Sequence, residues 1–88
     1  MDNFVQINVK DLPPPKPMVK ILTALSSLES HQVLKVLHRR EPFPLYEKLL
    51  EANWHYRCDK IADDDFVLYI FHLENIDLLN HLNDQTSA

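Results

Sequence analysis

The spacing of hydrophobic residues changes in a regular order along the first half of the chain. Apolar and polar residues alternate from Val5 to Val9, which predicts a strand with one buried face. Apolar residues then recur every three or four positions from Pro17 to near Ser30, a spacing typical of a helix that begins at a proline. Residues 33–38 are apolar and β-branched enough for a strand buried on much of both faces. This half therefore predicts strand, helix, strand.

The second half predicts one more helix and two strands. Helical spacing returns behind Pro44, and Asn53 is expected to end that helix in the left-handed conformation, because the chain contains no glycine. Residues 54–59 alternate as a strand does, and residues 66–71 are an unbroken apolar run that predicts another. The aspartates at 63–65 are expected to form the turn between these strands.

The resulting order, βαβαββ, predicts an α/β two-layer sandwich. Right-handed crossovers make the first three strands parallel and place both helices on one face of the sheet. The last two strands form a hairpin, so the fourth strand is antiparallel. The run at 66–71 is the most apolar strand and residues 54–59 are the most charged, so the fourth strand should lie inside and the third at an edge. We expect a four-stranded mixed sheet in the order 1-2-4-3.

Residues 1–73 are expected to form one α/β domain, and residues 74–88 a polar tail with at most one short helix. With both helices on one face, the last strand must turn three apolar side chains to the other face. The triplet is either Phe66, Leu68 and Ile70 or Val67, Tyr69 and Phe71. The tail patch at residues 76–82 is expected to cover them, or a second copy to dock there as a homodimer. The sequence leaves both alternatives open.

Composition narrows the classes of function. In 88 residues no apolar run approaches the roughly 20 residues that span a bilayer, and the start lacks the features of a signal peptide. A lone cysteine, Cys58, fits a reducing compartment. The net charge of −4 argues against nucleic-acid binding, which needs a concentrated basic face. We therefore expect a cytoplasmic protein with neither membrane nor nucleic-acid partners, and no cofactor.

The segment from Ile7 to Pro17 resembles the opening of the TusA-like (SirA-like) sulfur-carrier family. That family has an apolar-acidic-apolar-basic-glycine-leucine run, then Cys-Pro-x-Pro and a helix, within the same βαβαββ order. The resemblance covers roughly residues 4–72 and implies the family's two-layer fold. It places Pro14 at the cysteine position, Pro15 and Pro17 at the motif prolines, and Asp11 at the glycine.

A branch of bacterial domains of unknown function is similar in further respects. It shares the proline-rich front and a turn like His38 to Pro42, but offers no activity to transfer. In the sulfur carriers a thiolate before the first helix is made nucleophilic by the helix N-terminus. Pro14 has no sulfur, and Cys58 falls in phase with Trp54 and Tyr56, which predicts a buried and inert thiol.

No other nucleophile or metal motif is apparent. The five histidines have none of the spacings that make a metal site credible, and the aspartates at 63–65 lack the glycine and final glutamate of a calcium loop. We predict no catalytic residue and no metal site.

The turn from His38 to Glu41 follows one parallel strand, and Lys10 and Asp11 follow its neighbour. Ligands often bind at the carboxyl ends of such strands, arginines offer bidentate contacts, helix N-termini favour anions, and histidine changes charge near neutral pH. The candidate site is therefore Lys10, Asp11, His38, Arg39, Arg40 and Glu41.

The function this site predicts is noncatalytic: a binding or adaptor module for a small anionic ligand or an acidic segment of a protein partner. A plainer interpretation is that the arginines are solvated turn charges that Glu41 compensates. A different class of function is a sulfur- or redox-handling accessory protein that uses Cys58 or a thiol of its partner.

Overall fold

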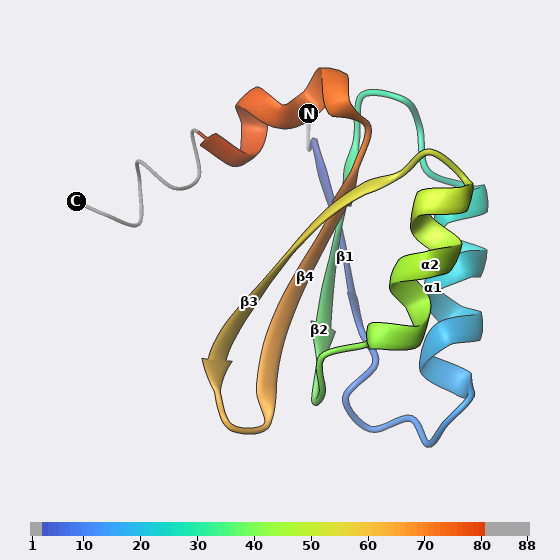
Figure 1. Ribbon diagram of the computed structural model, residues 1–88, viewed down its shortest axis with the longest axis vertical. Coiled ribbons are helices and arrows are strands. Elements are labelled where there is room, and N and C mark those ends of the chain that lie inside the picture. The colour runs from blue at the N-terminus through green and yellow to red at the C-terminus, as the bar shows by residue number, and fades with distance from the viewer. Residues whose placement is uncertain (1–2, 81–88) are drawn as a thin grey trace.

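The computed structural model describes residues 3–80 of the chain. Its elements are β1 (Phe4–Asn8), α1 (Lys16–Ser26), β2 (Val33–His38), α2 (Phe43–Glu51), β3 (His55–Ala62), β4 (Asp65–Phe71) and the 3-10 helix η1 (Leu73–Asn75). Residues 76–80 continue as a helix after η1. The predicted order of strands and helices is confirmed (Figure 1).

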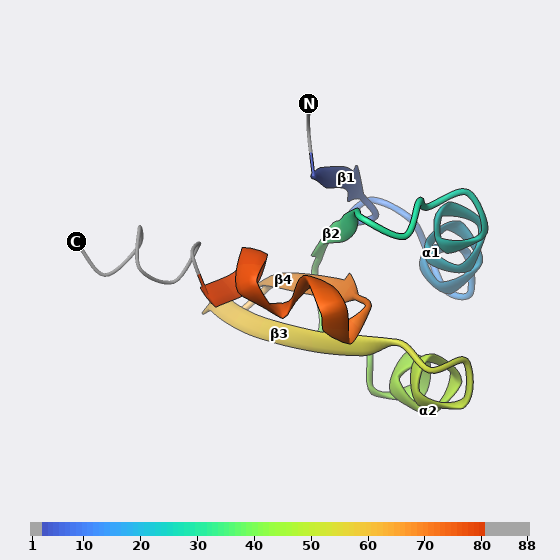
Figure 2. The ribbon, with the colours of Figure 1, turned by 90° about the horizontal axis from the view of Figure 1, so that it is seen from above.

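The strands form a single four-stranded sheet in the order β1-β2-β4-β3. β1 and β2 pair in parallel, and β4 pairs antiparallel with both β2 and β3. Both α1 and α2 lie on the same side of the sheet (Figure 2). The predicted two-layer sandwich, with β4 inside and β3 at an edge, is therefore confirmed.

The main core lies between the helices and the sheet. α2 contributes Leu45 and Leu49, and both are completely buried. Across from them β4 contributes Leu68 and Ile70. Because strand side chains alternate, Val67, Tyr69 and Phe71 are the triplet on the opposite face, which settles the choice that the sequence left open.

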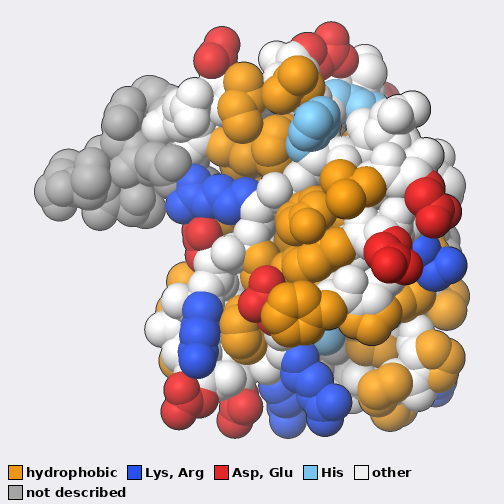
Figure 3. Space-filling view, in the orientation of Figure 1, with side chains coloured by type: hydrophobic (Ala, Val, Ile, Leu, Met, Phe, Trp, Pro, Cys, Tyr) orange, Lys and Arg blue, Asp and Glu red, His pale blue; other side chains and the backbone are white. Residues whose placement is uncertain are grey.

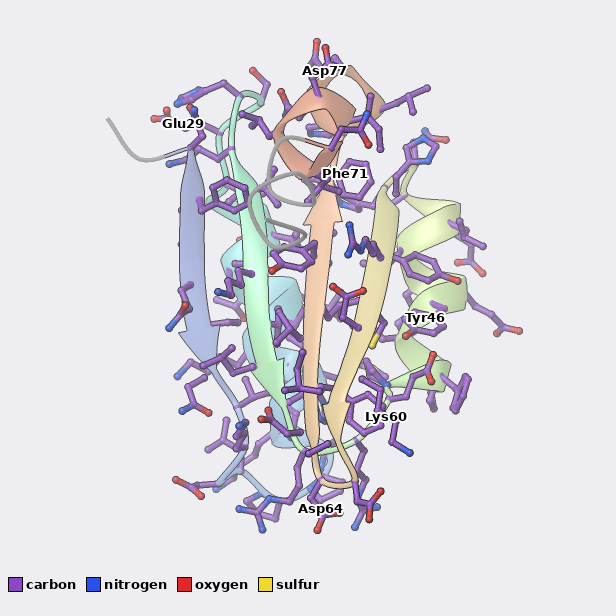
Figure 4. All side chains as sticks on the ribbon, turned by 90° about the vertical axis from the view of Figure 1, so that its left-hand side faces the viewer. Glu29, Tyr46, Lys60, Asp64, Phe71 and Asp77 are labelled. Atoms are coloured by element: carbon purple, nitrogen blue, oxygen red, sulfur yellow. The ribbon has the colours of Figure 1, made fainter. Side chains whose placement is uncertain are left out.

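The helix that follows η1 covers one end of that second face. Leu79 is 2% exposed and packs with Val33, Tyr69 and Phe71. Phe71 lies at the end of β4 below this helix (Figure 4). The sequence left open whether the tail or a second copy of the chain covers this face. At this end of the sheet the tail covers it. The rest of the predicted patch and tail, residues 81–88, lies outside the described residues.

The bounds of several elements differ from expectation: β3 runs on to Ala62 rather than Asp59, β1 is shifted by one residue, and α1 differs most. α1 ends at Ser26 rather than near Ser30, because the next two amides bond three residues back: Ser27 N–H to the carbonyl oxygen of Ala24 (3.1 Å) and Leu28 N–H to that of Leu25 (3.2 Å). Leu28 still packs against the core although it lies outside the helix. Its apolar side chain at helical spacing is the reason that the sequence predicted a longer α1.

In the hairpin, Asp65 belongs to β4, which leaves residues 63–64 as the turn. Asn53 has φ = 64°, so the predicted left-handed end of α2 is confirmed.

Candidate functional site

The carboxyl ends of β1 and β2 meet at one edge of the sheet because the two strands are parallel. Pairing continues one residue past β1, where Val9 N–H donates to the carbonyl oxygen of Leu37 (3.0 Å). The loops that follow enclose a pocket of about 520 Å³, which we name the edge pocket. It is lined by Val9, Lys10, Asp11, Leu12, Pro13, Pro14, Pro17, His38, Arg39 and Arg40. Five of the six predicted site residues, all except Glu41, therefore lie around one hollow.

A second pocket of about 370 Å³ adjoins the first, between the beginnings of α1 and α2. Its lining is mainly apolar: Pro14, Pro15, Pro17, Met18, Ile21, His38, Arg40, Glu41, Pro42, Pro44 and Leu45. We name it the proline pocket. Both pockets share Pro14, Pro17, His38 and Arg40, so the motif loop and the predicted turn form one continuous surface.

The basic side chains at this edge differ in how far they are neutralised. Lys10 Nζ lies 2.7 Å from Asp65 Oδ1, so its charge is already compensated. Arg39 Nη2 lies 3.3 Å from Oδ1 of Asp11, in an exposed pair that solvent screens. Within residues 3–80, Arg40 is in no ion pair. Arg40 is therefore the cation at this edge that is most available to a ligand. Basic groups border hydrophobic surface here (Figure 3).

Among residues 3–80, Glu41 forms an ion pair with neither arginine, although it lines the proline pocket beside Arg40. Its Oε2 accepts a hydrogen bond from the hydroxyl of Tyr46 (3.1 Å). The ring of Tyr46 in turn stacks on Tyr56 of β3, with 4.0 Å between centroids. Glu41 therefore faces the β3 side of the helix layer, and this geometry does not favour compensation of Arg39 or Arg40.

His38 is half-buried between the two pockets. Its Nδ1 accepts the backbone N–H of Arg40 (3.1 Å), which leaves Nε2 to donate to a ligand when the ring is neutral. Burial, and secondarily the charge of Arg40, lower the pKa of His38 below its ordinary value. A bound anion would oppose both effects and favour the protonated ring.

The helix N-termini offer an anion less than expected. Pro17 and Pro44 occupy first-turn positions and have no N–H to donate. Lys16 N–H already bonds the carbonyl oxygen of Pro13 (3.0 Å), and Phe43 N–H bonds that of Glu41 (3.0 Å). Side chains must therefore supply most of the attraction for a negative group.

Cys58 is a half-buried free thiol on β3 that packs against the main core. Burial raises its pKa, the Tyr46 hydroxyl partly offsets this by a hydrogen bond, and the charges of Glu41 and Asp59 raise it further. Cys58 lines neither pocket, and Pro14 stands where the resemblance placed a cysteine.

Two negative findings apply to residues 3–80. No group of three or more His, Cys, Asp or Glu side chains there is arranged to hold a metal ion. No helix in that range has the length and apolar character needed to cross a bilayer.

Sequence reasoning missed part of this surface. The start of α1 and of α2 supplies an apolar half, with Met18, Ile21 and Leu45 at its base. The parallel crossovers could have indicated it, because each helix begins at the edge where its preceding strand ends. The contact of Asp65 with Lys10 had no local signal, since it depends on β4 lying beside β2.

Comparison with known proteins identifies a family but no characterised relative. No curated protein and no solved structure matches the chain. The family described as "Uncharacterized conserved protein (DUF2249)" matches residues 6–72, a span that runs from β1 past the end of β4 and includes all six predicted site residues. The chain therefore belongs to the DUF2249 family of uncharacterized conserved proteins.

Proposed function

We propose that this chain is a noncatalytic binding or adaptor module that recognises an anionic group, on a small ligand or an acidic partner segment, at the carboxyl edge of β1 and β2. The observation that carries the proposal is the position of Arg40. Arg40 lines both pockets, and within the described part of the chain it is in no ion pair.

The two pockets suggest the chemistry of the ligand. A carboxylate or phosphate in the edge pocket would meet Arg40, with Arg39 and His38 beside it. An apolar group joined to that anion would reach the proline pocket, where Met18 and Pro44 contribute hydrophobic surface. We therefore favour an acidic ligand with an apolar neighbour over a free inorganic anion.

The scaffold is part of the proposal. Its resemblance to the TusA-like sulfur carriers suggests a domain that keeps the surface before α1 but has lost the nucleophile, since Pro14 replaces cysteine. The alternative, a sulfur- or redox-handling accessory that uses Cys58, is disfavoured because burial raises the pKa of this thiol. A thiol supplied by a partner would still need a binding surface of the kind proposed.

The test is a titration of isotopically labelled protein followed by nuclear magnetic resonance. The probes are inorganic phosphate, succinate and a short Asp-Glu-Leu peptide. We expect shifts confined to residues 9–18 and 38–45, with the peptide binding most tightly. Arg40→Ala should weaken peptide binding about tenfold or more, because a hydrogen bond to a charged group contributes roughly 1.5–3 kcal/mol.

Lys48→Ala is the matched control. Lys48 is an exposed cation on α2 that lines neither pocket, so its removal alters net charge without altering the site. Equal weakening by Arg40→Ala and Lys48→Ala would show only general charge attraction. Shifts that map to another surface would refute the proposed site.

A further inference from the structure

The two edge strands of the sheet differ in their protection against pairing. β3 carries Arg57, Asp59 and Lys60 and has an irregular register between Lys60 and Ala62. Charges and bulges of this kind keep an edge from adding another strand. β1, with the sequence Phe-Val-Gln-Ile-Asn, contains no charged residue, no proline and no register irregularity. Figure 4 shows β1 at the edge with no described element beyond it.

The hydrogen bonds between β1 and β2 identify which backbone groups of β1 point outward. Val33 N–H donates to the carbonyl oxygen of Asn3 (2.7 Å), and Val9 N–H donates to that of Leu37 (3.0 Å). In a parallel pair every second residue bonds the neighbouring strand, so the odd-numbered residues of β1 face β2. The even-numbered residues, Phe4, Gln6 and Asn8, therefore direct their N–H and C=O groups away from the sheet.

The three outward-facing residues of β1 are evenly spaced, with Gln6 in the middle. In an antiparallel pair, hydrogen-bonded positions recur every two residues, which is the spacing of Phe4, Gln6 and Asn8. A twofold axis at Gln6 opposes Gln6 to Gln6 of a second copy and Phe4 to Asn8 of that copy. All outward donors and acceptors of β1 would then be paired, with no register shift and no like charges opposed.

We propose that a second copy of this chain pairs antiparallel along β1, with the twofold axis at Gln6, and joins the two four-stranded sheets into one. The side chains also fit this arrangement. Val5 and Ile7 lie on the helix side and pack against the main core, so Val5 of one copy would oppose Ile7 of the other and extend that layer. The interface is distinct from the second sheet face that Leu79 partly covers, and it does not depend on the proposed ligand site.

The dimer should be weak. Pairing of five-residue strands buries less than the roughly 1,200–2,000 Å² of stable interfaces, and each copy carries a net charge of −4. We expect a dissociation constant between about 10 µM and about 1 mM, with tighter association at high salt because repulsion between the copies is screened.

The experiment is sedimentation analysis of the full chain over that concentration range, with Gln6→Lys and Gln6→Glu variants. Gln6 is exposed, so both variants should still fold, which circular dichroism checks, although Gln6→Lys places a second cation beside Lys35 of β2. Each variant places like charges opposite each other at the axis and should weaken self-association at least about tenfold. An equimolar mixture should restore dimers, because lysine then opposes glutamate. Thr23→Lys, at an exposed position on α1, adds the same charge away from β1 and should behave as wild type.

Amide hydrogen exchange supplies a second readout. On concentration, protection should rise at Phe4, Gln6 and Asn8 and stay unchanged at Val5 and Ile7, whose amides already bond β2. A wild-type chain that remains monomeric at about 1 mM would overturn the proposal. It would do so even if a strand of another protein were found to bind this edge. A dimer that Gln6→Lys leaves intact, or a mixture that does not recover association, would also overturn it.

Discussion

Replacing Leu45 by alanine tests how α2 packs on the sheet beneath the proline pocket, which Leu45 helps to line. Leu45 is 0% exposed, whereas Leu50 on the same helix is 59% exposed. Leu45→Ala removes three carbon groups, worth about 2.4 kcal/mol at about 0.8 kcal/mol each. The cavity left behind adds to this, so we expect the free energy of unfolding to fall by about 2–5 kcal/mol.

That loss is large for a chain of 88 residues, whose total stability is on the order of 4–13 kcal/mol. The assay is urea unfolding followed by fluorescence of the single tryptophan, Trp54, which stacks on His72 with centroids 4.1 Å apart. Leu50→Ala is the matched control and should cost no more than about 0.5 kcal/mol. Equal losses for the two variants, or a loss below about 1 kcal/mol for Leu45→Ala, would refute the orientation assigned to α2.

The remaining predictions concern four single positions. Cys58 should react with an aromatic disulfide reagent at least about tenfold more slowly in the folded chain than in urea at the same pH, and equal rates would revive a redox function. Because the pKa of His38 is lowered on folding, the unfolded chain binds more protons near pH 6 than the folded chain does. The contribution of His38 to the free energy of unfolding should therefore be complete above about pH 6.5 and should decrease as the pH falls below that value. His38→Gln should flatten this slope in urea unfolding measured between about pH 7.5 and about pH 5.5. Asn53→Gly should retain stability and Asn53→Ala should lose about 1 kcal/mol by thermal unfolding, since only the alanine carries the full cost of φ = 64°. Pro14→Cys should fold as wild type by circular dichroism because Pro14 is exposed, and should accept no sulfur from a persulfide donor; measurable transfer would show that the proline alone had disabled a carrier.

The candidate site was predictable in outline for a topological reason. Crossovers through helices force β1 and β2 to run in parallel, so Lys10 and Asp11 had to lie near His38 and Arg39. The partner of each charge was not predictable. Glu41 bonds Tyr46 five residues later rather than an adjacent arginine, and Lys10 reaches Asp65 on a strand distant in sequence.

The sequence by itself determined the order of elements, the strand order β1-β2-β4-β3 and the left-handed Asn53, because periodicity, crossover handedness and the lack of glycine are local or topological constraints. Only the tertiary structure decided which face of β4 meets the helices, since a strand with apolar residues on both sides satisfies either choice. It also decided that Leu79 covers one end of the second face, and that Arg40, rather than Lys10 or Arg39, is left without an ion pair among the described residues. Both outcomes depend on contacts between segments far apart in sequence, which carry no signal in the spacing of residues along the chain.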